Sequence, residues 1–202
     1  MLAVQRQNRA DFFSGVGLCP RPKNFVITLH PETLSAQNTV MAQAMLDALE
    51  SFPDAGLIFT GSNADPGAAD LDKIIRDWVA IRDRAVFHAS LGSRRYFSAL
   101  EHCDLVLGNS SSGLYEAPSF GIPTVNIGDR QSRRVRAVSV IDSLVDTKSI
   151  IAAIETALAS DWTGTLNPYG DGQSASRILS HLASINNPAA LIRKSFEDLN
   201  HD

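Results

Sequence analysis

Residues 108–116 read GNSSSGLYE, so three serines and a glycine stand between an apolar run and an amphipathic segment. If a strand ends before this turn and a helix begins after it, the turn offers backbone N–H groups without helical partners. Small side chains let an anion approach those donors, and serine hydroxyls add hydrogen bonds. Ser110, Ser111, Ser112 and Gly113 would therefore suit a diphosphate, although serine and glycine also cap helices without any ligand.

Two charged residues follow this turn, and each has two interpretations. Glu116 stands on the expected first turn of a helix, where a carboxylate is favourable because of the helix dipole alone. The same carboxylate could instead accept hydrogen bonds from the two hydroxyl groups of a ribose. Arg130 belongs to the basic segment DRQSRRVR at 129–136 and could contact a ligand or remain a solvated surface charge. Taken singly, neither residue decides between its two roles.

Five short apolar segments are expected to be strands, and amphipathic segments separate them. The expected strands are NFVITLH (24–30), GLIFTGS (56–62), AVFHAS (85–90), DLVLGNS (104–110) and TVNIGDR (124–130). Segments such as RRYFSALEHC (94–103) and GLYEAPSF (113–120) are expected to be the intervening helices. Alternating strands and helices with continuously apolar strands are typical of a parallel sheet covered on both faces. The pattern predicts an α/β fold with a doubly wound parallel sheet.

Polar residues gather where the expected strands end. They are His30, Ser62, Asn63, His88, Asn109, Ser110, Ser111, Ser112, Asp129 and Arg130. A lone histidine at a strand end is usually an ordinary structural residue. His30 and His88, however, follow two strands at matching positions, and chance would scatter polar residues over both edges of the sheet. Since ligands of such sheets bind beyond the carboxyl ends of the strands, we predict a binding site at that edge.

Composition narrows the class of protein. The chain has 202 residues, of which 44% are hydrophobic and 20% are charged, as expected for a globular domain with a sizeable core. A net charge of −4 gives no reason to expect a nucleic-acid partner. Cys19 and Cys103 fit a reducing compartment and show no metal-ligand spacing, so no metal site is predicted.

No apolar run approaches the roughly 18 residues of a membrane span, and the first residues lack the apolar core of a secretory signal. We therefore expect a cytoplasmic protein without a membrane partner. The first 22 residues are less regular than the rest. We expect residues 1–22 to be a lead-in segment and residues 23–202 to be the ligand-binding domain.

Three segments together resemble the UDP-N-acetylglucosamine 2-epimerase family. They are TLHPET (28–33), GNSSSGLYEAPSFGIPTVNIGDRQ (108–131) and YGDGQSASRIL (169–179). The resemblance is to the hydrolysing branch, which makes N-acetylmannosamine for sialic-acid-type sugars. It implies one half of a GT-B architecture, in which two Rossmann-like domains enclose the active site. This chain resembles the C-terminal, UDP-binding half.

The resemblance also implies roles for individual residues. The UDP contacts of the family fall on His88, Ser110, Ser111, Glu116 and Arg130. The first two serines would hold the diphosphate, and Glu116 would hold the ribose. His30 matches a family histidine that reaches towards the sugar and diphosphate, and it is our candidate catalytic residue. Asn63 matches a residue of the cleft, and Ser112 and Gly113 are possible contacts beside the diphosphate.

By resemblance, the reaction is that of a hydrolysing UDP-N-acetylglucosamine 2-epimerase, in which UDP leaves by elimination and water adds to the resulting glycal. It implies no cofactor. The family's proton-transferring carboxylates lie in the N-terminal domain, so we expect this chain to bind UDP or UDP-GlcNAc but to be inactive alone. If it proves active, Glu32 and Asp65 are the first acids to mutate.

The expected partners are a UDP-sugar, the missing N-terminal domain and a second copy in a homodimer. A GT-B glycosyltransferase domain and a non-catalytic UDP-sugar-binding module remain the alternatives.

Overall fold

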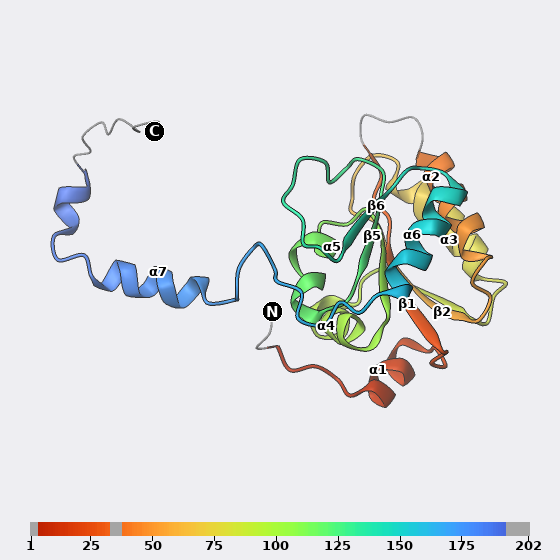
Figure 1. Cartoon of the computed structure of the whole chain (residues 1–202), viewed down its shortest axis with the longest axis horizontal. Helices are drawn as coiled ribbons and strands as arrows, with labels where there is room; N and C mark the ends of the chain where they lie inside the picture. Colours follow the sequence, from red (N-terminus) through yellow and green to blue (C-terminus); the bar gives the residue numbers. More distant parts are fainter. Residues whose placement is uncertain (1–3, 33–37, 193–202) are drawn as a thin grey trace. The chain divides into compact units, whose positions relative to one another are not determined.

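The computed structural model describes residues 4–32 and 38–192 and contains a parallel six-stranded sheet between two layers of helices (Figure 1). The strands are β1 (Lys23–Thr28), β2 (Ala55–Thr60), β3 (Ala85–His88), β4 (Leu105–Gly108), β5 (Thr124–Ile127) and β6 (Val140–Ser143). Their order is β3-β2-β1-β4-β5-β6, and all neighbouring pairs are parallel. The prediction of a doubly wound α/β fold is confirmed.

Helices precede, follow and connect the strands of the sheet. They are α1 (Arg9–Val16), α2 (Asn38–Leu49), α3 (Ala68–Val79), α4 (Gly92–His102), α5 (Ser112–Tyr115), α6 (Thr147–Ala159) and the 3₁₀-helix η1 (Ala117–Phe120). Local chemistry sets several of their ends. The Asn8 side chain accepts from the backbone N–H of Asp11 at the start of α1, and Asp146 does the same for Ser149 at the start of α6.

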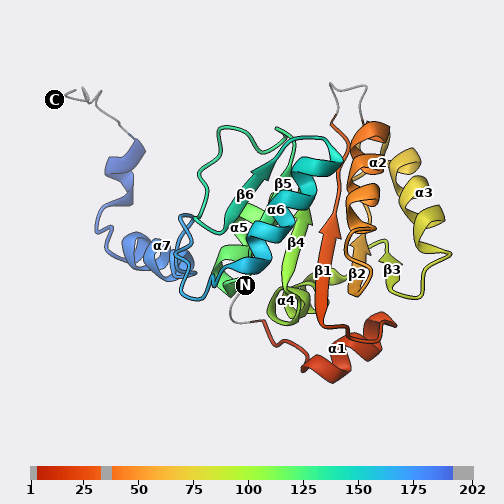
Figure 2. The same ribbon diagram turned by 45° about the vertical axis from the view of Figure 1, so that its right-hand side comes forward.

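Two hydrophobic clusters cover the two faces of the sheet, as Figure 2 shows for the helices. On one face α2, α3 and α6 contribute buried residues such as Met45, Leu71 and Ile150. On the other face α1 and α4 contribute residues such as Phe12 and Leu100. Coverage on both faces explains why strands such as β2 are buried at every position. Helix α1, which lies within the expected lead-in segment, is thus part of this core.

The chain divides into two compact units, Met1–Tyr169 and Gly170–Asp202. The sheet and the predicted site residues belong to the first unit. In the second unit, α7 (Ser174–Ala183) and the 3₁₀-helix η2 (Pro188–Ile192) follow one another, and Arg177 pairs with Asp171 across 2.6 Å. The boundary that we predicted at residues 22 and 23 stays a prediction.

Candidate functional site

The crossover direction of the sheet reverses between β1 and β4, which lie side by side at its centre. In doubly wound sheets this reversal opens a crevice beyond the carboxyl ends of the two strands. Gly108 ends β4 with a φ of +129°, and a Cβ added there would lie 2.0 Å from the carbonyl oxygen of Thr28. Only glycine allows the end of β4 to approach β1 this closely, so the arrangement of the two strand ends depends on Gly108.

Asn109 ties the two loops that leave β1 and β4. It is fully buried, and its Oδ1 accepts from the backbone N–H of His30 at 2.7 Å. Its Nδ2 donates to the carbonyl oxygen of His30 at 2.8 Å. These two bonds mimic a step of strand pairing beyond the sheet. The position of His30 is therefore set by a side chain that sequence reasoning had counted only among the polar residues of the edge.

The ring of His30 is held in a defined tautomer. Its Nδ1 accepts a hydrogen bond from the backbone N–H of Asn63 at 3.1 Å, so a neutral ring carries its hydrogen on Nε2. Burial lowers the pKa of His30, and the nearby guanidinium of Arg130 lowers it further. Both effects favour the neutral imidazole. His30 is consequently suited to donate one hydrogen bond from Nε2 rather than to carry a positive charge.

Arg130 and Gln131 reach the same place from the end of β5. Nη1 of Arg130 donates to the carbonyl oxygen of Asn109 at 3.3 Å, and Nε2 of Gln131 donates to the same oxygen at 2.8 Å. The structure thus brings together His30, Arg130 and the residue that precedes the serine turn. This gathering was predicted from the strand ends, whereas the contribution of Gln131 was not.

The serine turn leads into a helix that is shorter than expected. Helix α5 contains four residues, so its dipole is small, and the donors themselves matter more than the dipole. Ser110 and Ser111 are half-buried, and within the described residues their backbone N–H groups make no hydrogen bond. Oγ of Ser110 accepts weakly from the N–H of Ser112 at 3.4 Å. Two N–H groups and hydroxyls thus remain for an anion.

Gly113 has a packing role. A Cβ added to Gly113 would lie 2.4 Å from Cγ2 of Thr124 in β5, and Oγ1 of Thr124 donates to the carbonyl oxygen of Gly113 at 3.0 Å. The glycine therefore lets α5 sit close against the sheet. The predicted ligand contact at Gly113 stays a prediction.

Glu116 lies at the junction of two short helices. The prediction that it stands on the first turn of a longer helix is wrong, since α5 ends at Tyr115 and η1 begins at Ala117. Pro118 follows in η1, and a proline cannot continue the hydrogen bonds of an α-helix. Oγ of Ser112 donates to Oε2 of Glu116, and the hydroxyl of Tyr96 lies 2.5 Å from Oγ of Ser112.

Tyr96 was not among the predicted site residues. It lies in α4, where an aromatic residue at helical spacing is the ordinary sign of a core position. Nothing in the spacing distinguishes a tyrosine that packs from one that also directs its hydroxyl towards a neighbouring turn. Only the three-dimensional packing of α4 against α5 brings the phenol to Ser112.

His88 and Asn63 have other contacts. Nε2 of His88 lies 3.0 Å from the carbonyl oxygen of Val16. His88 ends β3, which β2 separates from β1. Asn63 has an exposed side chain and acts in the observed network through its backbone N–H. Their predicted contacts with a ligand stay predictions.

Glu32 adds a carboxyl group just beyond His30. Its Oε1 is buried and accepts no hydrogen bond from the part of the chain that the structure describes. Burial raises the pKa of Glu32, and the negative charge of Asp129 raises it further. An unpaired carboxyl oxygen of this kind is uncommon in a folded protein and is a candidate ligand contact.

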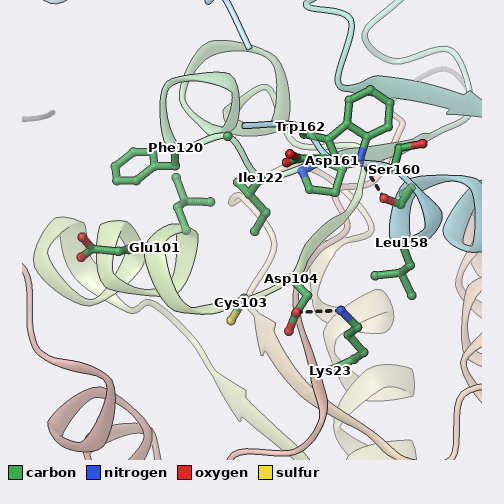
Figure 3. A pocket seen from close by; sticks show the side chains of 14 residues that line it. Lys23, Glu101, Cys103, Asp104, Phe120, Ile122, Leu158, Ser160, Asp161 and Trp162 are labelled. Atoms are coloured by element: carbon green, nitrogen blue, oxygen red, sulfur yellow. Dashed lines mark hydrogen bonds and ion pairs between the residues drawn. The ribbon is translucent and has the colours of Figure 1, made fainter. Parts of the chain in front are cut away.

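A pocket of about 290 Å³ lies at the opposite edge of the sheet (Figure 3). Its lining includes Lys23 at the start of β1, Asp104 before β4 and Trp162 after α6. Lys23 and Asp104 pair across 3.2 Å. No residue of the predicted site lines this pocket, so it is separate from the crevice.

Donors for an anion at the crossover point of a doubly wound parallel sheet are typical of nucleotide-binding α/β folds. A family model described as UDP-N-acetylglucosamine 2-epimerase matches residues 3–183. The chain belongs to the UDP-N-acetylglucosamine 2-epimerase family.

Two curated relatives extend this assignment. The chain is 34% identical to the GDP/UDP-N,N'-diacetylbacillosamine 2-epimerase (hydrolyzing) of Campylobacter jejuni. The aligned region of 141 residues covers 69% of this chain and 37% of that protein. It is 35% identical over 151 residues to the polysialic acid biosynthesis protein P7 of Escherichia coli, which covers 72% of this chain and 38% of that protein. The matched region thus spans less than half of each relative.

Among solved structures, the UDP-GlcNAc 2-epimerase of Methanocaldococcus jannaschii in complex with UDP-GlcNAc and UDP has the same fold. The TM-score is 0.69 at 20% identity, and the match covers 90% of this chain and 50% of that one. Matching half of such a chain agrees with the expected half of a GT-B architecture.

Two further observations concern the described residues only. None of their helices is long and apolar enough to cross a membrane. They contain no group of three or more His, Cys, Asp or Glu side chains arranged to hold a metal ion.

Proposed function

We propose that this chain is the nucleotide-binding half of a hydrolysing UDP-N-acetylglucosamine 2-epimerase, which converts UDP-GlcNAc to N-acetylmannosamine and UDP. The observation that carries the proposal is the arrangement at the carboxyl ends of β1 and β4. There the Ser110 and Ser111 N–H groups without partners among the described residues, the neutral ring of His30 and the guanidinium of Arg130 come together. Family membership and the hydrolysing relative from C. jejuni support the reaction type.

In this proposal the diphosphate binds at Ser110 and Ser111. Their N–H groups and hydroxyls supply neutral donors, and Arg130 supplies a positive charge beside them. The carboxylate of Glu116 accepts from the ribose hydroxyls, because a carboxylate offers about four acceptor positions and Ser112 uses one. His88 and Asn63 remain proposed contacts of the wider cleft.

His30 serves the departure of UDP. When the bond between the sugar and the diphosphate breaks, negative charge develops on the departing phosphate oxygen. A hydrogen bond from Nε2 of the neutral ring stabilises that charge more strongly as it grows, which is the condition for a contribution to rate. His30 is therefore proposed as a catalytic hydrogen-bond donor.

Proton abstraction from the sugar requires a base within hydrogen-bond reach of the carbon-bound proton. Nδ1 of the neutral His30 ring already accepts a hydrogen bond from the N–H of Asn63, so His30 is not free to act as the base. Glu116 is assigned to the ribose. Glu32 is a carboxyl group of this edge with a buried oxygen that accepts no hydrogen bond from the described residues. We propose that the missing half supplies the main acids and bases and that this chain alone turns over little or no substrate.

Calorimetry and a turnover assay on the same preparation test the proposal. UDP should bind, GDP serves as the control for the nucleobase, and UDP-GlcNAc should yield no UDP above background unless a complementary N-terminal half is added. Absence of UDP binding would refute the assignment. Turnover that needs a sugar acceptor would indicate the glycosyltransferase alternative, and binding that no added half converts to turnover would favour the non-catalytic module. A cytoplasmic location and a homodimer complete the proposal.

A further inference from the structure

Three hydroxyl and carboxyl groups form a chain of hydrogen bonds that runs from the interior to the edge of the site. The hydroxyl of Tyr96 in α4 lies 2.5 Å from Oγ of Ser112 at the start of α5, and Oγ of Ser112 donates to Oε2 of Glu116. These residues come from two different helices and from the junction that follows the second one. These hydrogen bonds therefore couple the packing of α4 to the conformation of Glu116.

The direction of this chain follows from the chemistry of its members. Ser112 has a single hydroxyl hydrogen, and that hydrogen is directed to the Glu116 carboxylate. The Tyr96 hydroxyl must therefore be the donor to Ser112. Burial raises the pKa of the Tyr96 phenol, so the phenol keeps the hydrogen that this arrangement requires, although the residue as a whole is only half-buried.

The chain of hydrogen bonds leaves one oxygen of the Glu116 carboxylate available to a ligand. Oε2 is engaged by Ser112, whereas Oε1 accepts no hydrogen bond from any described residue. Glu116 is half-buried, so its carboxylate is partly open to the surroundings. A carboxylate that is fixed on one oxygen and open on the other is prearranged to accept from hydroxyl groups of a ligand, because its conformational freedom has already been reduced.

We propose that Tyr96, acting through Ser112, is a positioning residue that orients Glu116 towards a ligand with two neighbouring hydroxyl groups. This inference rests on the proposed function, in which that ligand part is the ribose of UDP. It gives Ser112 a role different from the diphosphate contact that the sequence suggested. It also explains why a tyrosine, rather than a phenylalanine of the same shape, occupies this place in α4.

Binding of UDP and of 2′,3′-dideoxy-UDP tests the inference. Tyr96→Phe keeps the ring in its packing and removes only the hydroxyl. We expect it to weaken UDP binding about three- to tenfold, which is the scale of one lost hydrogen bond, and to change dideoxy-UDP binding less than twofold. Ser112→Ala should have the same selective effect, and Ser112→Thr, which keeps a hydroxyl, should restore most of the affinity for UDP.

The double variant adds a further criterion. Because Tyr96 acts through Ser112, Tyr96→Phe combined with Ser112→Ala should be no weaker than Ser112→Ala alone. Equal losses for UDP and dideoxy-UDP in Tyr96→Phe would show a general structural role and overturn the inference, as would unchanged binding of both. If Glu116→Gln itself leaves UDP binding unchanged, the proposed ribose contact fails instead. A Glu116→Gln effect without a Tyr96→Phe effect refutes only the role of Tyr96.

A measurement without ligand keeps the inference testable if UDP does not bind. In protein labelled with ¹³C at tyrosine Cζ, the Tyr96 signal is assigned by its loss in Tyr96→Phe. That signal should move in Ser112→Ala and in Glu116→Gln, and it should stay near its original position in Ser112→Thr. A signal that stays in place in both Ser112→Ala and Glu116→Gln would show that the chain of hydrogen bonds does not exist in solution.

Discussion

Replacing Asn109 by alanine should damage both the stability of the sheet unit and its binding of UDP. The side chain of Asn109 makes two hydrogen bonds to the main chain of His30, at 2.7 and 2.8 Å, in a fully buried place. Asn109→Ala removes both bonds and leaves an N–H and a carbonyl group of His30 without these partners. Among the described residues, no other side chain then hydrogen-bonds the segment after β1 to the end of β4.

The size of the effect follows from these contacts. A hydrogen bond contributes about 0.5–1.5 kcal/mol net, and a buried polar group left unpaired costs about 1–3 kcal/mol. For two bonds that are partly replaced by water, we expect the free energy of unfolding to fall by about 2–4 kcal/mol. For a unit of this size, that corresponds to a decrease in Tm of roughly 5–15 °C. UDP affinity should fall about three- to thirtyfold because His30 is no longer held beside the serine turn.

Asn24 provides a matched control at the opposite edge of the sheet. It is equally buried, and its side chain also makes two main-chain bonds to one residue, Arg21, at 3.0 and 2.7 Å. Asn24→Ala should therefore reduce Tm by a similar amount and leave the UDP affinity within about twofold of the original. Thermal unfolding and calorimetry at a temperature well below both transitions separate the two effects.

Equal losses of UDP affinity in both variants would refute this reasoning. They would mean that binding follows the overall stability of the unit and not the link between His30 and Asn109. A stable Asn109→Ala variant with unchanged affinity would show that the crevice does not need this tie.

Further predictions concern the same edge. Ser110→Ala combined with Ser111→Ala should reduce the free energy of UDP binding by about 1–3 kcal/mol, measured by calorimetry, and an unchanged value would remove the diphosphate assignment. Glu116→Gln should weaken UDP more than 2′-deoxy-UDP, whereas equal losses would indicate a structural role. Because the folded state lowers the pKa of His30, its contribution to stability is present above about pH 6.5 and is lost as the pH falls below it. From pH 8 to pH 5.5, the free energy of unfolding should therefore fall more for the original protein than for His30→Gln, and equal decreases would contradict this. In Arg130→Ala, NMR titration should show a higher pKa of His30.

Much of the fold could be predicted because the central strands are buried on both faces and therefore read as continuous apolar runs. Strand β6 (Val140–Ser143) escaped prediction for the same reason. It is an edge strand whose residues are mostly half-exposed, so Asp142 and Ser143 interrupt any apolar run. The prediction of one helix over 113–120 is wrong because Pro118 interrupts its hydrogen bonds, and this proline was visible in the sequence.

The sequence predicted which residues of the site lie at the same end of the parallel strands, but not how they contact one another. Strand ends placed His30, Asn109, Ser110 and Arg130 at one edge, and the structure brings these residues together. The partners that fix their state were not predictable from spacing. The N–H of Asn63 sets the tautomer of His30, and this depends on how two loops meet in space.

The described edge of the sheet carries more anion-binding donors than free carboxyl groups, and this supports the proposed division of labour between this chain and a second half. Its donors, which are serine N–H groups, the neutral ring of His30 and the guanidinium of Arg130, suit a negatively charged diphosphate. The carboxylate of Glu116 is already engaged by Ser112. Glu32, whose pKa responds to the nearby Asp129 and Arg130, is a candidate for proton transfer with one buried oxygen that accepts no hydrogen bond from the described residues. General acids and bases contribute about 10²–10⁴-fold each, so a half that lacks most of them should bind the leaving group almost fully and catalyse almost nothing. If Glu32→Gln abolished a measurable turnover by the isolated chain while UDP binding persisted, the division would be wrong, and Glu32 would be a proton-transferring group in its own right.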